Sequence, residues 1–128
     1  MTDPAAASDP LRVLLVDPDD RVRESLAGLL RIGQRCVVVG TAGSTAEALE
    51  QAAELIPDVV VVDPRLPDVD ASSLIARIRA VAPASRVLVL NWSDTADLTT
   101  GADSYTRKTF RPQELIDAVL ATVHRPVA

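Results

Sequence analysis

The sequence has one cysteine, Cys36, and therefore no second thiol with which to form a disulfide. Cys36 begins an apolar run, residues 36–39, so we interpret it as a buried, reduced thiol, as is typical of a cytoplasmic protein. No apolar run approaches the roughly eighteen residues that a membrane span requires. Residues 1–10 have neither the basic start nor the apolar centre of a signal peptide, and we expect them to form a flexible tail. We therefore expect no contact with a membrane.

Basic residues are too few and too scattered to predict a nucleic-acid site. The chain has 13 Lys and Arg against 18 Asp and Glu, a formal net charge of -5, and no block of basic residues. We expect no direct binding of nucleic acid by this domain. The single histidine, His124, lies near the C-terminal end, where we expect it to be solvated, so no phosphohistidine site is predicted.

A glycine-rich phosphate loop is also missing. The turn at residues 40–43 contains two glycines but matches neither nucleotide-binding fingerprint. A flavodoxin-like enzyme or nucleotide binder is therefore only a remote alternative, and we expect the chain not to be an enzyme.

Apolar segments do alternate with segments of helical periodicity. At 128 residues and 48% hydrophobic content, the chain can bury one core, which we assign to a domain at residues 11–125. The expected strands are residues 11–16, 36–39, 58–62, 86–90 and 103–107. This alternation predicts a parallel sheet with helices on both faces, which is a three-layer α/β fold.

Four helical segments have an apolar face. In chain order, the positions expected to face the sheet are Val22, Leu26, Leu29 and Leu30; Leu49, Ala53 and Ile56; Leu74, Ile75, Ile78 and Val81; and Leu115, Ile116, Val119, Leu120 and Val123. Ser44 and Glu47 have the spacing of a capping box, and Pro112 suits a first helical turn. Residues 91–101 hold little apolar material, so we expect any helix there to be irregular and no longer than two turns.

Two aspartates follow strands of the predicted sheet. Asp17 comes directly after the first strand, and Asp63 comes after the run of four valines in the third. The carboxyl ends of parallel strands meet at one edge of an open α/β sheet, where such folds bind their ligands. Both carboxylates are therefore expected at that edge.

These features resemble the response-regulator receiver domains of two-component signalling. The resemblance is carried by VLLVD, which ends at Asp17; by VVVVDPRLPDVDA, which contains Asp63; by RVLVL, which precedes Asn91; and by GADSYTRKTF, which contains Tyr105 and Lys108. It extends over residues 11–123 and implies a flavodoxin-like fold with strand order 2-1-3-4-5. The order and spacing of the four motifs together make it specific.

The resemblance implies roles for individual residues. Asp63 would be the phosphoacceptor, and Lys108 would hold the phosphoryl oxygens. Asp63, Asp17 through water, and the backbone carbonyl of Arg65 would hold a Mg²⁺ ion. Asn91 and Tyr105 would occupy the switch positions. The implied partner is a protein, either a histidine kinase or a downstream regulator, and the resemblance also admits a homodimer.

The acid that usually follows Asp17 in this family is replaced by Pro18, which removes a direct ligand of the metal ion. Losing one charge some 4 Å from another forfeits about 4 kcal/mol at an effective dielectric of 20, before screening. Even about 1.4 to 3 kcal/mol weakens binding roughly tenfold to a hundredfold. Two interpretations of Asp19 remain open: it completes an acidic pocket with Asp17, or it caps the next helix.

Other positions also depart from the family. Asn91 replaces a hydroxyl with an amide, which weakens the expected switch, and Trp92 either crowds the pocket or fills core volume. Thr109 replaces a proline, so we expect a trans peptide bond after Lys108 and a different direction for the lysine side chain. Tyr105 is either a mobile aromatic or an ordinary half-buried strand residue.

Two functional hypotheses follow. We favour an atypical receiver that acts mainly as a protein-interaction module, with impaired Mg²⁺-dependent phosphorylation, because several functional positions are altered together. The alternative is a functional phosphoacceptor, in which a histidine kinase phosphorylates Asp63 and a population shift changes partner affinity.

Overall fold

The computed structural model describes residues 9–91 and 101–124. Five parallel strands form one sheet in the order β2-β1-β3-β4-β5, which confirms the predicted flavodoxin-like topology. The strands are β1 (Leu11–Val16), β2 (Cys36–Ala42), β3 (Val59–Val62), β4 (Arg86–Asn91) and β5 (Ser104–Arg107). The helices are α2 (Asp20–Arg31), α3 (Thr45–Leu55), α4 (Ala71–Val81) and α5 (Pro112–His124), and a 3₁₀ turn, Ile32–Gln34, follows α2.

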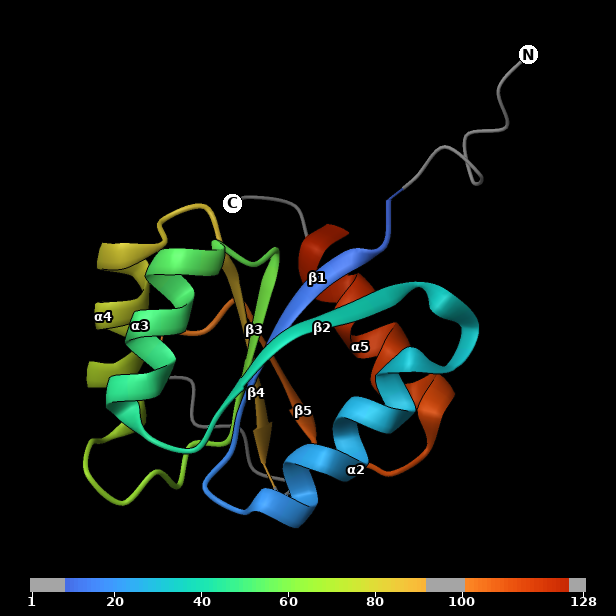
Figure 1. Ribbon diagram of the computed structural model, residues 1–128, viewed down its shortest axis with the longest axis horizontal. Coiled ribbons are helices and arrows are strands. Elements are labelled where there is room, and N and C mark those ends of the chain that lie inside the picture. Colours follow the sequence, from blue (N-terminus) through green and yellow to red (C-terminus); the bar gives the residue numbers. More distant parts are fainter. Residues whose placement is uncertain (1–8, 92–100, 125–128) are drawn as a thin grey trace.

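Helices cover both faces of the sheet, as predicted (Figure 1). α3 and α4 pack on one face, and α2 and α5 pack on the other. Because successive side chains of a strand point to opposite faces, each central strand contributes to both cores. In β1, Leu14 and Val16 face α3 and α4, whereas Val13 and Leu15 face α2 and α5.

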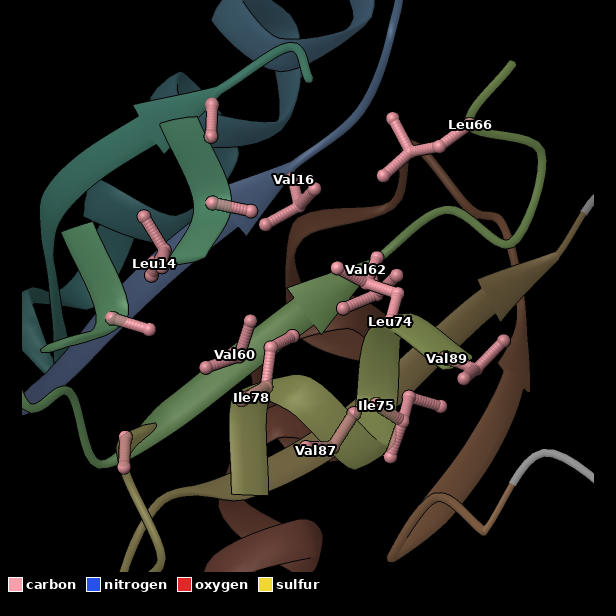
Figure 2. Close-up of a cluster of buried hydrophobic side chains, with 14 residues drawn as sticks. Leu14, Val16, Val60, Val62, Leu66, Leu74, Ile75, Ile78, Val87 and Val89 are labelled. Atoms are coloured by element: carbon pink, nitrogen blue, oxygen red, sulfur yellow. The ribbon is translucent and has the colours of Figure 1, made fainter. Parts of the chain in front are cut away.

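β3 lies at the centre of the sheet and carries no polar side chain. Its four valines are at most 2% exposed. Figure 2 shows Val60 and Val62 against Leu74 and Ile78 of α4. A strand buried on both faces accommodates only apolar side chains, so the first polar residue, Asp63, comes where the strand ends.

The apolar face predicted for α3 is wrong at two positions. Its buried residues are Thr45, Ala48 and Ala52, and Leu49 packs partly against the same core. Ala53 is exposed, and Ile56 lies beyond the helix as its C-cap, with φ 45° and 56% exposure. The inward positions go to small side chains, which let α3 approach the sheet closely.

The other differences from the prediction are small: β3 and β5 each begin one residue later, at Val59 and Ser104, and β4 ends one residue later, at Asn91. β2 continues to Ala42, because Gly40 still pairs with Leu14 beyond a register shift. Val81 is 41% exposed, because it is the last residue of α4 and the next residue, Ala82, is buried instead. Ser44 is the N-cap of α3, as predicted.

Some expectations lie outside the described residues. They are the flexible tail as far as residue 8, the short helix between residues 91 and 101, and the role of Trp92. Within residues 9–91 and 101–124, no helix has both the length and the apolar character needed to cross a bilayer.

Candidate functional site

Asp17 and Asp63 lie at the carboxyl edge of the sheet, directly after the neighbouring strands β1 and β3. Val16 pairs with Val62 in the sheet, and the backbone amide of Asp63 donates to the carbonyl oxygen of Val16 at 2.8 Å. Each aspartate is 2% exposed. The parallel register thus places the two buried carboxylates next to each other at the same edge of the sheet.

Lys108 connects the two acids. It follows β5, and its backbone amide donates to the carbonyl oxygen of Asn91 at 2.6 Å. Its Nζ donates to Oδ2 of Asp63 at 2.7 Å and also to Oδ2 of Asp17. The Lys108 side chain, the only lysine of the chain, is 0% exposed. The expected redirection of this side chain is therefore wrong: the described residues contain no cis peptide bond, yet Lys108 still reaches both carboxylates.

Arg65 has a contact at the site that sequence reasoning missed. The resemblance assigns a role to its backbone carbonyl, which stays a prediction, and the structure adds that its side chain binds Asp63. Nε donates to Oδ1 at 3.1 Å and Nη2 donates to Oδ2 at 2.8 Å, while the Arg65 backbone amide also donates to Oδ1 at 2.8 Å. An arginine two positions after a predicted phosphoacceptor was the available signal, because its side chain is long enough to turn back.

These contacts change the acidity of Asp63. Burial alone raises the pKa of this carboxyl, but hydrogen bonds from the Arg65 side chain, Lys108 and the Arg65 amide, together with the charge of Lys108, outweigh burial and lower the pKa to about 2. Asp63 is therefore a carboxylate throughout the physiological pH range. An ionised carboxylate is the form that can act as a nucleophile.

The lowered pKa predicts an acid-dependent contribution to stability. The folded-state pKa of about 2 lies below the ordinary 3.8, so the contribution is present above about pH 4 and is lost as pH falls through about 2. Its size is about 2 kcal/mol. Urea unfolding of the wild type and Asp63→Asn from about pH 5 to about pH 2 should show their stability difference shrinking by about that amount. A constant difference would contradict the assignment.

In the arrangement that the structure describes, Lys108 contacts both carboxylates that would face a Mg²⁺ ion, Asp17 and Asp63. Asp19 caps α2, accepting hydrogen bonds from the amides of Arg21 at 2.9 Å and Val22 at 3.2 Å, which favours the cap over the acidic-pocket interpretation. Pro18 is exposed and offers no side-chain oxygen. Mg²⁺ requires near-octahedral oxygen ligands. In the part of the chain that the structure describes, no three His, Cys, Asp or Glu side chains gather as a metal-binding group.

The remaining predicted site residues lie around this cluster. Asn91 ends β4 and pairs with Arg107 of β5. Tyr105, also on β5, is half-buried and packs against the core under α3 and α4, as one of its two interpretations requires. His124 is exposed at the end of α5 and lines a cleft with Leu11 at the start of β1, which is the opposite edge of the sheet from Asp17 and Asp63.

Two buried acids at the carboxyl ends of β1 and β3, joined by a lysine after β5, form the arrangement that the resemblance implied. The sequence matches the response regulator receiver domain family over residues 13–120. The chain belongs to this family. Receiver domains are signalling modules of two-component systems that interact with histidine kinases and other proteins, and they generally bind Mg²⁺ at their phosphorylation site.

Individual proteins support the assignment. The chain is 34% identical over 119 residues to the transcriptional regulatory protein LnrK of Bacillus subtilis, covering 89% of this chain and 54% of that protein. It is 37% identical over 115 residues to the DNA-binding transcriptional activator DevR/DosR of Mycobacterium tuberculosis, covering 85% and 52%. The chain therefore spans about half the length of these curated relatives. The signal receiver domain of the response regulator NarL from M. tuberculosis superposes with a TM-score of 0.83 at 28% identity, covering 93% of this chain and 100% of that one.

Proposed function

We propose that this receiver domain acts in the cytoplasm mainly as a protein-interaction module of a two-component system, with impaired Mg²⁺-dependent phosphorylation of Asp63. One observation carries the proposal. Asp17 and Asp63 share the ammonium group of Lys108, and Pro18 stands where a third acid would add negative charge. A cluster of two acids with an internal cation attracts a divalent ion only weakly. Signalling through Mg²⁺ and phosphate is correspondingly weakened.

The proposed partner is a protein: a histidine kinase, a downstream regulator or a second copy of the chain. Beside the site, a shallow cleft of about 550 Å³ is lined by residues of β5 and the loop after it, among them Arg107 and Phe110. Phe110 is 46% exposed. Aromatic rings and arginines are enriched in protein interfaces, which supports this surface as the contact region. The net charge of -5 gives no support to direct binding of nucleic acid by this domain.

A functional phosphoacceptor is the second candidate. It is favoured by the convergence of Asp17, Asp63 and Lys108 and by the low pKa of Asp63, which keeps the carboxylate ionised. In this case phosphorylation would shift the domain between two states that differ in partner affinity.

The two candidates predict different results with acetyl phosphate. If the interaction module is correct, intact-mass measurement over hours should show little addition of a phosphoryl group, with no clear increase when Mg²⁺ is added. Sedimentation should likewise show the same oligomeric state with and without the donor. Rapid, complete, Mg²⁺-dependent addition that Asp63→Asn abolishes would reject impaired phosphorylation and establish the second candidate.

A further inference from the structure

The Arg65 side chain holds both oxygens of the Asp63 carboxylate. Nε contacts Oδ1 at 3.1 Å and Nη2 contacts Oδ2 at 2.8 Å. This two-point pairing matches the planar fork of a guanidinium to a carboxylate, and charge-assisted pairs of this kind are among the strongest hydrogen bonds in proteins. The Arg65 amide adds a further bond to Oδ1 at 2.8 Å and fixes the turn that brings the side chain back.

Asp63 is saturated in this arrangement. With Lys108 on Oδ2 at 2.7 Å, its carboxylate accepts four hydrogen bonds. An ionised carboxylate offers about four lone-pair sites. A metal ion needs one of these sites, and so does attack on a phosphorus atom. Neither can occur while the Arg65 side chain stays in place.

The charges of the cluster also balance. Asp17 and Asp63 each carry one negative charge, and Lys108 and Arg65 each carry one positive charge, so the net charge is zero. A divalent ion entering a neutral cluster gains little Coulomb energy with which to offset the loss of its hydration. Removing the Arg65 charge makes the cluster negative.

Of the two cations, only Arg65 can leave without opening the core. The Lys108 side chain is 0% exposed, whereas the Arg65 side chain is 55% exposed. Rotation about the side-chain bonds of Arg65 is enough to move the guanidinium into solvent, where it is well hydrated. The exposed cation is therefore the movable part of the cluster.

We propose that Arg65 is a built-in counter-ion of Asp63. Its guanidinium occupies the carboxylate oxygens in place of a divalent ion and so closes the carboxylate, blocking access to it until the side chain rotates into solvent. The role rests on the function proposed above for Asp63 and adds the residue that controls access to it. When acetyl phosphate is the donor, a carboxylate oxygen of Asp63 forms the new P–O bond. The bond from phosphorus to the acetate oxygen breaks, and acetate leaves with the electron pair.

Titration calorimetry of the whole chain with MgCl₂, without a phosphodonor, tests this role. Arg65→Gln removes both the charge and the fork, whereas Arg65→Lys keeps the charge but cannot hold two oxygens through a planar group. Arg111→Gln is the matched control, because it removes the same charge from a side chain that lies three positions after Lys108, is 82% exposed and pairs with Glu114. Circular dichroism checks that each variant is folded.

Arg65→Gln should bind Mg²⁺ at least about tenfold more tightly than the wild type. The Mg²⁺ affinity of Arg65→Lys should lie between those of the wild type and Arg65→Gln. The affinity of Arg111→Gln should stay within about twofold of the wild type, because solvent and salt screen an exposed charge. Equal affinities for Arg65→Gln and Arg111→Gln would overturn the counter-ion role. If Arg65→Gln does not fold, the comparison of Arg65→Lys with the wild type decides, and equal affinities there would also overturn it.

Acetyl phosphate provides an independent readout of access. Arg65→Gln should acquire a phosphoryl group several-fold faster than Arg111→Gln, and equal rates would count against closure of Asp63. The two proposals can fail separately. Rapid phosphorylation of the wild type would reject the impaired receiver, whereas the metal titration still decides whether Arg65 competes for the carboxylate.

Discussion

Replacing Lys108 with methionine is expected to lower the free energy of unfolding by about 3 to 5 kcal/mol, because it removes the cation from a buried ion cluster. The Asp17 and Asp63 side chains that would remain are 3% and 1% exposed. Two carboxylates held out of water without the ammonium between them repel each other and lose their hydrogen bonds to Nζ. Urea unfolding at neutral pH measures the loss.

Two further variants separate this effect from a simple loss of packing. Adding Asp17→Asn to Lys108→Met removes one of the two buried negative charges that Lys108 contacted, and should restore part of the lost stability. Arg111→Met removes a cation that is 82% exposed and should change stability by no more than about 0.5 kcal/mol. If Lys108→Met lowered the free energy of unfolding no more than Arg111→Met does, the buried cluster would not be a significant source of stability.

Replacing Pro18 with aspartate is expected to raise the affinity for Mg²⁺ by roughly tenfold to a hundredfold. The substitution adds a carboxylate next to Asp17 at the same edge of the sheet, and Pro18 is exposed, so the new side chain need not displace any core residue. Calorimetric titration of the wild type and the variant with MgCl₂ measures the change.

Pro18→Ala is the control, since it removes the proline ring without adding charge. Equal titrations of Pro18→Asp and Pro18→Ala would show that the missing acid does not limit metal binding. Combining Pro18→Asp with Arg65→Gln tests how the two changes interact. The cluster of Asp17, Asp63 and Lys108 would then carry two net negative charges including the new acid, and we expect tighter binding than in either single variant.

Most of the fold could be predicted because the apolar pattern has one dominant explanation in each segment. The valines of β3 are apolar in succession, and only the centre of a parallel sheet buries both faces of a strand. The prediction was less accurate for α3, where Ala48 and Ala52 face the core and Ile56 does not. Alanine gives a weak apolar signal in the sequence, yet its small size is what close packing on a sheet requires.

The site could be predicted in part. Asp17, Asp63 and Lys108 are recognisable because each immediately follows a strand whose place in the sheet follows from the topology. The direction of the Lys108 side chain was predicted wrongly, because it was inferred only from the replacement of a proline by Thr109. Its position is instead set by two acids that lie 91 and 45 positions earlier in the chain.

The sequence by itself determined which strands form, where the acids follow them, and that Pro18 removes one acid from the set, because hydrophobic periodicity and residue identity are local properties of the chain. Only the tertiary structure decided that the Arg65 guanidinium pairs with both oxygens of Asp63 and that Asp19 caps a helix. A long, flexible side chain takes its direction from the charges around it. Those charges come together only when β1, β3 and β5 bring distant segments to one edge of the sheet.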